Sequence, residues 1–303
     1  MTSTQAHLRR RIRRWAGAIA LTVVVAGPGG AFASASELLY ERAVMTAANS
    51  RCALFVAPLA SALDAARAQA RNAALRGGAD AASLDAVEQR ARGKAARTAC
   101  DAPDLVTAAA RVRAAFEAYA KLDRMAYPGD ITGWRADRGA GRTLRWRLAQ
   151  DVSFGWNRMT FGLAGKEGEG VLVAVASFPD GAQPYSARLV MRDAARSSGP
   201  YLDRRSVDLN GKLPLERRLP PPSSLKAYTA QARSAAGADL ASKSARNAWA
   251  FRFPQAAAGQ LAALDPREAV AVDFVFPGDV VRRAYVEVGD FAAGKAFLQL
   301  AAR

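Results

Sequence analysis

Arginines that alternate with tryptophans between residues 134 and 158 are the side chains of this chain best suited to binding chemistry. Guanidinium groups beside indole rings suit sugars that carry phosphate or carboxylate, and also phospholipid headgroups. We therefore predict a surface for anionic ligands, formed by Trp134, Arg135, Arg138, Arg142, Arg145, Arg147 and Arg158. The alternative is a linker followed by a strand whose tryptophans point inward and whose arginines point outward.

Two carboxylates near the end of the chain, Glu287 and Asp290, straddle the end of a predicted strand and could converge on one site. Paired carboxylates perform general acid–base catalysis, so one hypothesis is a histidine-free hydrolase that acts on an envelope glycan. A glutamate at a strand edge and an aspartate that caps a helix explain the same pair without catalysis.

Other catalytic signatures are missing or incomplete. The only histidine, His7, lies in a segment that we expect to be removed, which excludes Ser-His-Asp catalysis and histidine-ligated zinc in the mature chain. The Ser223-x-x-Lys226 spacing resembles that of penicillin-binding proteins, but no Lys-Thr-Gly or Ser-Asp-Asn motif accompanies it. The glycine-rich segment 165–170 contains two glutamates that would repel phosphate, so we expect a hairpin turn there. We expect no catalytic residue, no metal and no cofactor.

The two cysteines lie at similar distances on either side of the Gly77-Gly78 turn. In an antiparallel pair of helices, which rise about 1.5 Å per residue, Cys52 and Cys100 would be nearly level. Cysteines so placed in an exported chain predict a structural disulfide. A redox-active pair is not indicated, because the chain has no Cys-x-x-Cys.

Residues 1–35 predict a secretory signal peptide. Five arginines precede an apolar run from Trp15 to Ala26 that is too short to span a bilayer, and small-residue cleavage sites follow between Ala31 and Ala35. No second segment of membrane-spanning length follows. We therefore expect a periplasmic protein without a transmembrane span, with release from the cell as the alternative.

The chain is strongly basic, with a formal net charge of +16 over 303 residues. The predicted signal peptide holds five arginines and no acid, so its removal would leave +11. The excess is mostly arginine in an alanine-rich chain, which a GC-rich coding sequence also produces. The charge therefore indicates either composition alone or an anionic partner.

Residues 36–127 read as a helical domain, a hairpin or three-helix unit. An apolar stripe of helical spacing continues past Pro58, so we expect a kink there and not an end. We expect Ser83 to cap a second helix and Pro103 to open a third. Alanine at many stripe positions indicates close packing within the chain or, alternatively, a dimer-forming coiled coil.

Residues 128–142 are polar and glycine-dotted, and predict a linker. From residue 143 to 303 the apolar period changes to two, which predicts an antiparallel β-sheet or sandwich closed by a C-terminal helix. Within it, residues 214–246 form a proline-rich connection and an alanine-rich excursion, either a surface helix or a mobile segment. The expected strands lie at 143–148, 159–163, 171–178, 185–191, 247–253, 270–276 and 284–288, with 207–209 as a further option.

The ending Val-Glu-Val-Gly-Asp-Phe-Ala-Ala-Gly-Lys-Ala-Phe-Leu, residues 286–298, reads as a strand that leads into a closing helix. It resembles the end of small periplasmic proteins of the invasion-associated locus B type. The cysteine pattern of that family is missing from the β-rich half of this chain, so no residue or role is carried over.

These observations predict an exported α+β protein that serves as a non-enzymatic cell-envelope binding or scaffold module. The expected partners are anionic envelope components, namely peptidoglycan or lipid headgroups, or another envelope protein. Export argues against nucleic acid as a partner. The alternatives are the carboxylate-dependent hydrolase and an assembly subunit that dimerises through its helices.

Overall fold

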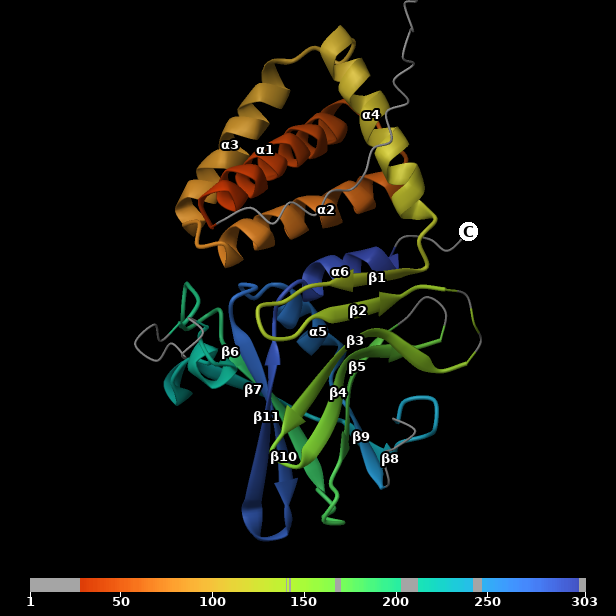
Figure 1. Cartoon of the computed structure of the whole chain (residues 1–303), viewed down its shortest axis with the longest axis vertical. Helices are drawn as coiled ribbons and strands as arrows, with labels where there is room; N and C mark the ends of the chain where they lie inside the picture. Colours follow the sequence, from red (N-terminus) through yellow and green to blue (C-terminus); the bar gives the residue numbers. More distant parts are fainter. Residues whose placement is uncertain are drawn as a thin grey trace, which may run out of the picture.

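A computed structural model describes residues 28–139, 141, 143–166, 170–202, 212–241 and 247–299. A unit of helices lies above a β domain with two antiparallel sheets, and a C-terminal helix lies between them (Figure 1). The predicted α+β class is confirmed. Residues 1–27 of the predicted signal peptide, Arg142 and the optional strand at 207–209 lie outside the described residues.

The helical unit contains four helices, α1 (Pro28–Cys52), α2 (Ala57–Arg76), α3 (Ala81–Arg97) and α4 (Pro103–Ala120). The prediction of one long helix kinked at Pro58 is wrong. The chain breaks after Cys52, where Ala53 has a φ of 48°, and Pro58 lies in the first turn of α2, where its missing N–H is not needed. Asp80, and not Ser83, caps α3 by accepting the Ser83 N–H at 3.0 Å.

Small side chains let the helices of this unit pack closely. Both α2 and α3 pack against α1. Two apolar clusters fill the space between the helices, one built around Leu39, Ala70, Ala74, Leu75, Leu84 and Val87, the other around Met45, Ala48, Leu63, Ala95, Leu105 and Ala109. Across the surface, Arg67 and Arg71 of α2 form ion pairs with acids of α3.

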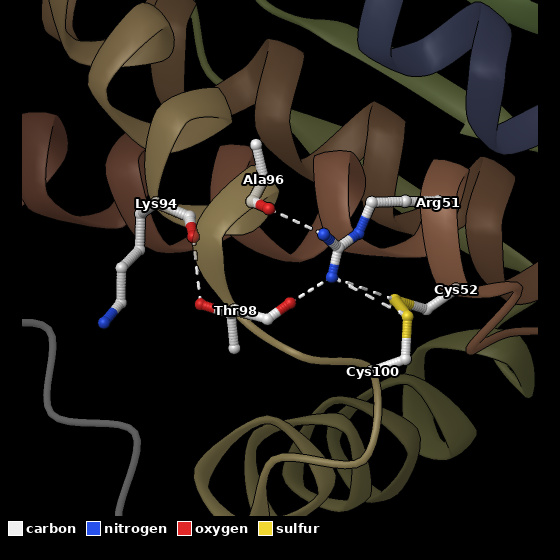
Figure 2. The surroundings of a disulfide bond; sticks show 6 residues. All are labelled: Arg51, Cys52, Lys94, Ala96, Thr98 and Cys100. Atoms are coloured by element: carbon white, nitrogen blue, oxygen red, sulfur yellow. Dashed lines mark hydrogen bonds between the residues drawn. A yellow bond between two sulfur atoms is a disulfide. The ribbon is translucent and has the colours of Figure 1, made fainter.

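The predicted disulfide is confirmed, and Cys52 joins the end of α1 to Cys100 after α3 with a Cα–Cα distance of 5.6 Å. It forms because α2 and α3 have similar lengths, so the end of α3 returns to the level of Cys52. Arg51 reinforces the junction by donating to the carbonyls of Ala96 and Thr98 beside both sulfur atoms (Figure 2).

The larger sheet has seven strands, all paired antiparallel. In spatial order they are β1 (Arg124–Tyr127), β2 (Trp134–Asp137), β3 (Arg145–Phe154), β4 (Asn157–Gly165), β5 (Val171–Ser177), β9 (Ala248–Arg252) and β8 (Ala232–Ala235). The smaller sheet has four, β11 (Val280–Glu287), β10 (Ala269–Phe276), β6 (Ser186–Arg192) and β7 (Leu225–Thr229).

Three segments differ from the sequence prediction. Residues 134–137, inside the predicted linker, are strand β2, and residues 124–127 before them are β1. The excursion at 225–246 is neither a surface helix nor a mobile segment over 225–235, because β7 and β8 pair with β6 and β9 there. These segments are exposed along part of their length, so their apolar alternation is weak and strand pairing decides their structure.

The main core lies between the inner faces of the two sheets. Its largest side chains are aromatic, and Phe274 contacts Phe154, Phe178 and Phe251 at centroid distances of 5.4 to 5.7 Å. Helices α5 (Gln255–Ala262) and α6 (Phe291–Gln299) close this core, and α6 also packs against α2 and β2. Short 3₁₀ turns lie at Leu215–Arg218, Pro222–Ser224 and Pro277–Asp279.

Candidate functional site

The residues of the predicted anionic surface do not lie together, and three of them are buried. The Trp134 indole donates to the Val288 carbonyl at 3.0 Å, within the core. Arg138 donates to the last carbonyls of α4 and its guanidinium lies 4.4 Å above the ring of Phe297, so it caps that helix. Arg147 donates to the Gly139 carbonyl at 2.8 Å. These three side chains serve the fold.

The other arginines of that set lie closer to solvent but are mostly paired. Arg135 contacts Asp151 at 2.7 Å, and Arg145 lies 3.9 Å from Asp137. Arg158 is exposed and has no ion pair within the described part of the chain. The alternative interpretation, with tryptophans inward and arginines outward, holds for β2 and fails in β3.

The failure in β3 has a local cause. A register shift between Trp146 and Leu148 reverses the alternation, so Trp146 turns to the outer face of the sheet while Leu148 enters the core. There the Trp146 indole donates to the carbonyl of Leu240 at 2.9 Å.

Glu287 is fully buried and acts as the anchor of a loop. Its carboxylate accepts the backbone N–H groups of Asp130 at 2.7 Å, and of Ile131 and Thr132 at 2.9 Å each. A side chain at Gly129 would collide with the Thr132 carbonyl and with this carboxylate, so a glycine lets the loop close around the acid. With three donors directed at it, this carboxylate is satisfied inside the protein.

Asp290 is also fully buried, and it binds Arg76 at the end of α2 through two hydrogen bonds of 2.8 and 3.1 Å. This bidentate pair joins the helical unit to the start of α6. The two carboxylates of the alternative hydrolase hypothesis therefore have separate internal partners and no exposed surface for a substrate. Ser223 and Lys226 also differ from the catalytic arrangement, since a 3₁₀ turn and strand β7 hold them and not one helix face.

Two adjoining hollows open along the larger sheet, with volumes of about 610 and 590 Å³. The first lies over the outer face of β4, β5, β8 and β9, and the second lies between the sheet and helices α5 and α6. Val171 and Arg252 line both. Leu240, Val173 and Ala250 form an apolar floor in the first, while Gln231, Gln255 and Gln299 supply amide groups in the second.

Among the described residues, the charged side chains that line these two hollows are all basic. Lys166 lines the first, Lys295 lines the second, and Arg252 lies between them. The described lining contains no Asp or Glu, and no ion pair joins these three cations to an acid among the described residues. The Arg252 cavity pair, as we call these two hollows, can therefore receive an anion that also carries apolar and hydrogen-bonding groups.

A third hollow of about 600 Å³ differs in charge. Leu240 separates it from the Arg252 cavity pair by packing on Ala164 and Val173 of the same sheet face. Arg124 and Arg135 line it, but so do acids that neutralise them, namely Asp137, Asp151 and Asp239. With two arginines and three aspartates in its described lining, this hollow is slightly acidic and does not favour an anion.

The sequence carried part of the signal for the Arg252 cavity pair. Alternation in β9 turns Phe251 and Phe253 inward, which directs Arg252 outward. The sequence alone could not assign Lys166 and Lys295 to the same site, because they are far apart in the chain. Only the folded structure places their two hollows next to each other. The local mark of the site in the sequence is an alternating strand with an outward arginine, which has no ion pair among the described residues.

Within the described ranges, no group of three His, Cys, Asp or Glu side chains could hold a metal ion, and no helix is long and apolar enough to cross a membrane. Comparisons of the chain with protein-family models, with curated proteins and with solved structures found no match. The candidate site therefore rests on its own geometry.

Proposed function

We propose that this protein is an exported, non-enzymatic binding module of the cell envelope that binds peptidoglycan through the Arg252 cavity pair. The observation that carries the proposal is the lining of these hollows, with three cations and no acid among the described residues. Peptidoglycan presents carboxylates together with sugar hydroxyls and amides. Cations suit the carboxylates, and the glutamine side chains suit the hydroxyls and amides.

Export is supported by two independent features. The first 35 residues have the arginines, the apolar run and the small-residue sites of a secretory signal peptide. The Cys52–Cys100 disulfide is typical of proteins from oxidising compartments such as the periplasm. A periplasmic location would bring the Arg252 cavity pair to its ligand.

A binding role is favoured over hydrolysis by the use of the two carboxylates. Glu287 and Asp290 are each held by donors from the protein itself, so neither is free to accept a proton from a substrate or water. No observation on the described residues favours the helix-mediated dimer.

The test is co-sedimentation of the mature chain, which begins at Ser36, with purified peptidoglycan at low and at physiological salt. We expect binding that weakens with salt, since the site is open to solvent. Each exposed charge contributes about 0.5–1 kcal/mol, so the Arg252→Ala/Lys295→Ala variant should bind about five- to thirtyfold more weakly.

The matched control removes the same two charges elsewhere. Arg90 and Lys94 are exposed on α3, and Arg90→Ala/Lys94→Ala should bind like the wild type. Absence of wild-type binding, or equal losses in the two double variants, would contradict the proposal.

A further inference from the structure

Trp156 is the most exposed large hydrophobic residue described, with 92% of its surface accessible. It lies in the turn between β3 and β4, where Phe154 pairs directly with Asn157 and leaves only Gly155 and Trp156 as the loop. Gly155 has a φ of 57°, which the tight turn requires. Phe154 stacks on Phe274 of the core, at a centroid distance of 5.7 Å. The turn is therefore anchored, and it presents the indole to solvent.

Arg282 connects this turn to the neighbouring hairpin of the smaller sheet. Its guanidinium lies 3.5 Å from the Asn157 side-chain oxygen and 2.6 Å from the carboxylate of Asp180. The two residues before it are partly open to solvent, with Val280 55% exposed and Val281 42% exposed. The turn between β10 and β11 lies at the end of the molecule away from the helical unit (Figure 1).

Tyr185 belongs to the same end. Its backbone N–H bonds to the Val275 carbonyl at 2.9 Å, and its hydroxyl donates to Asp279 at 3.1 Å, although half of the residue remains exposed. We call Trp156, Tyr185, Val280 and Val281 the distal tip. Large apolar side chains exposed together at one end of a molecule indicate a surface that contacts a partner or a membrane.

We infer that the distal tip docks on the surface of a phospholipid bilayer, with Trp156 inserted at the level of the headgroups. Tryptophan and tyrosine prefer this layer because each has an apolar body and a polar group that stays hydrated. Trp156 projects from a turn with nearly all of its surface in solvent, which suits a soft partner better than a rigid one. This inference does not depend on the Arg252 cavity pair.

Charge around the distal tip is mixed with a small basic excess, because Arg282 pairs with Asp180 and the exposed Asp279 is outnumbered by Arg158 and Arg188, which favours an anionic bilayer. Arg158 follows Trp156 by two residues, is exposed, and has no ion pair in the described part of the chain. Arg188 pairs only at 3.9 Å with Asp273 and keeps 45% of its side chain exposed. Basic residues beside an inserted aromatic strengthen binding to anionic headgroups in a salt-dependent way.

The test uses the mature chain, which begins at Ser36, and vesicles of phosphatidylethanolamine with phosphatidylglycerol, compared with phosphatidylcholine alone. We expect sedimentation with the anionic vesicles, and quenching of tryptophan emission by brominated lipid. Trp156→Ala should lower vesicle binding by about ten- to a hundredfold, because a large apolar side chain is no longer buried, and should abolish most of the quenching. The substitution is at a solvent-exposed turn, so the fold should persist.

Two further variants separate the outcomes. Val106→Ala removes another exposed apolar side chain, on α4, and should leave vesicle binding unchanged. Arg252→Ala/Lys295→Ala should weaken peptidoglycan binding and retain vesicle binding, whereas Trp156→Ala should weaken vesicle binding and retain peptidoglycan binding. Equal vesicle binding by wild type and Trp156→Ala overturns the inference. Absence of wild-type binding to both vesicle types also overturns it, and would direct attention to a protein partner at the distal tip.

Discussion

Replacing Glu287 by glutamine tests the claim that this buried carboxylate holds the loop at 129–132. The variant keeps the shape of the side chain but exchanges one acceptor oxygen for an NH₂ donor. Its remaining oxygen can keep the two N–H groups of Ile131 and Thr132, which now share one neutral acceptor. The NH₂ group would then face the N–H of Asp130, which loses its acceptor.

The expected loss follows from these contacts. A buried donor without an acceptor costs about 1–3 kcal/mol, and changing two charge-assisted hydrogen bonds into neutral ones costs about 1 kcal/mol more. We therefore expect Glu287→Gln to lower the free energy of unfolding by about 2–4 kcal/mol. Urea denaturation followed by circular dichroism measures it, provided that the slope of the transition is unchanged.

The control for this experiment is Glu117→Gln. Glu117 is exposed on α4 and has no ion pair among the described residues, so the same loss of charge should change the free energy of unfolding by less than about 0.5 kcal/mol. If Glu287→Gln were no more destabilising than this control, the carboxylate would not anchor the loop. The catalytic hypothesis for Glu287 would then have to be considered again.

Two other predictions concern the contact between the helical unit and α6. Arg76→Ala leaves the charge of Asp290 buried without its partner and should lower the free energy of unfolding by about 3–5 kcal/mol. In a double-mutant cycle measured by urea denaturation, Arg76→Ala/Asp290→Ala should lose less stability than the sum of the two single variants. Burial, followed by the hydrogen bond with Tyr119, raises the pKa of the Tyr127 hydroxyl far above its ordinary value. The unfolded chain releases this proton at about pH 10, while the folded protein retains it. The contribution of Tyr127 to the free energy of unfolding is therefore complete below that pH and should fall as the pH rises above it. Tyr127→Phe should make this alkaline fall in Tm shallower; an unchanged slope would contradict the assignment.

The strands with strong apolar alternation could be predicted from the sequence, because one of their faces is buried in the core. The alternation of Phe251 and Phe253 with Arg252 is an example, and the hairpin of β10 and β11 is another. The break at Cys52 was not predicted, because α1 and α2 both use the same apolar stripe and only the short connection at 53–56, with the left-handed Ala53, separates them.

The candidate site was harder to predict for a physical reason. Trp134 and Arg138 look like binding residues in the sequence, but the fold uses them as a core aromatic and as a helix cap. The cations of the Arg252 cavity pair, which have no ion pair among the described residues, are far apart in the chain, and their meeting depends on which edge of the sheet faces α6. Periodicity gives the direction of a side chain on its strand, but it does not give its neighbours from other elements.

The central claim is that peptidoglycan occupies the Arg252 cavity pair, and a methyl NMR titration with soluble muropeptides tests it most directly. Val171, Val173 and Leu240 line these hollows and provide methyl groups at the site. We predict that their signals shift first and saturate together, and that Arg252→Ala/Lys295→Ala weakens the titration. Shifts confined to methyl groups away from these hollows, or no shifts at all, would contradict the account.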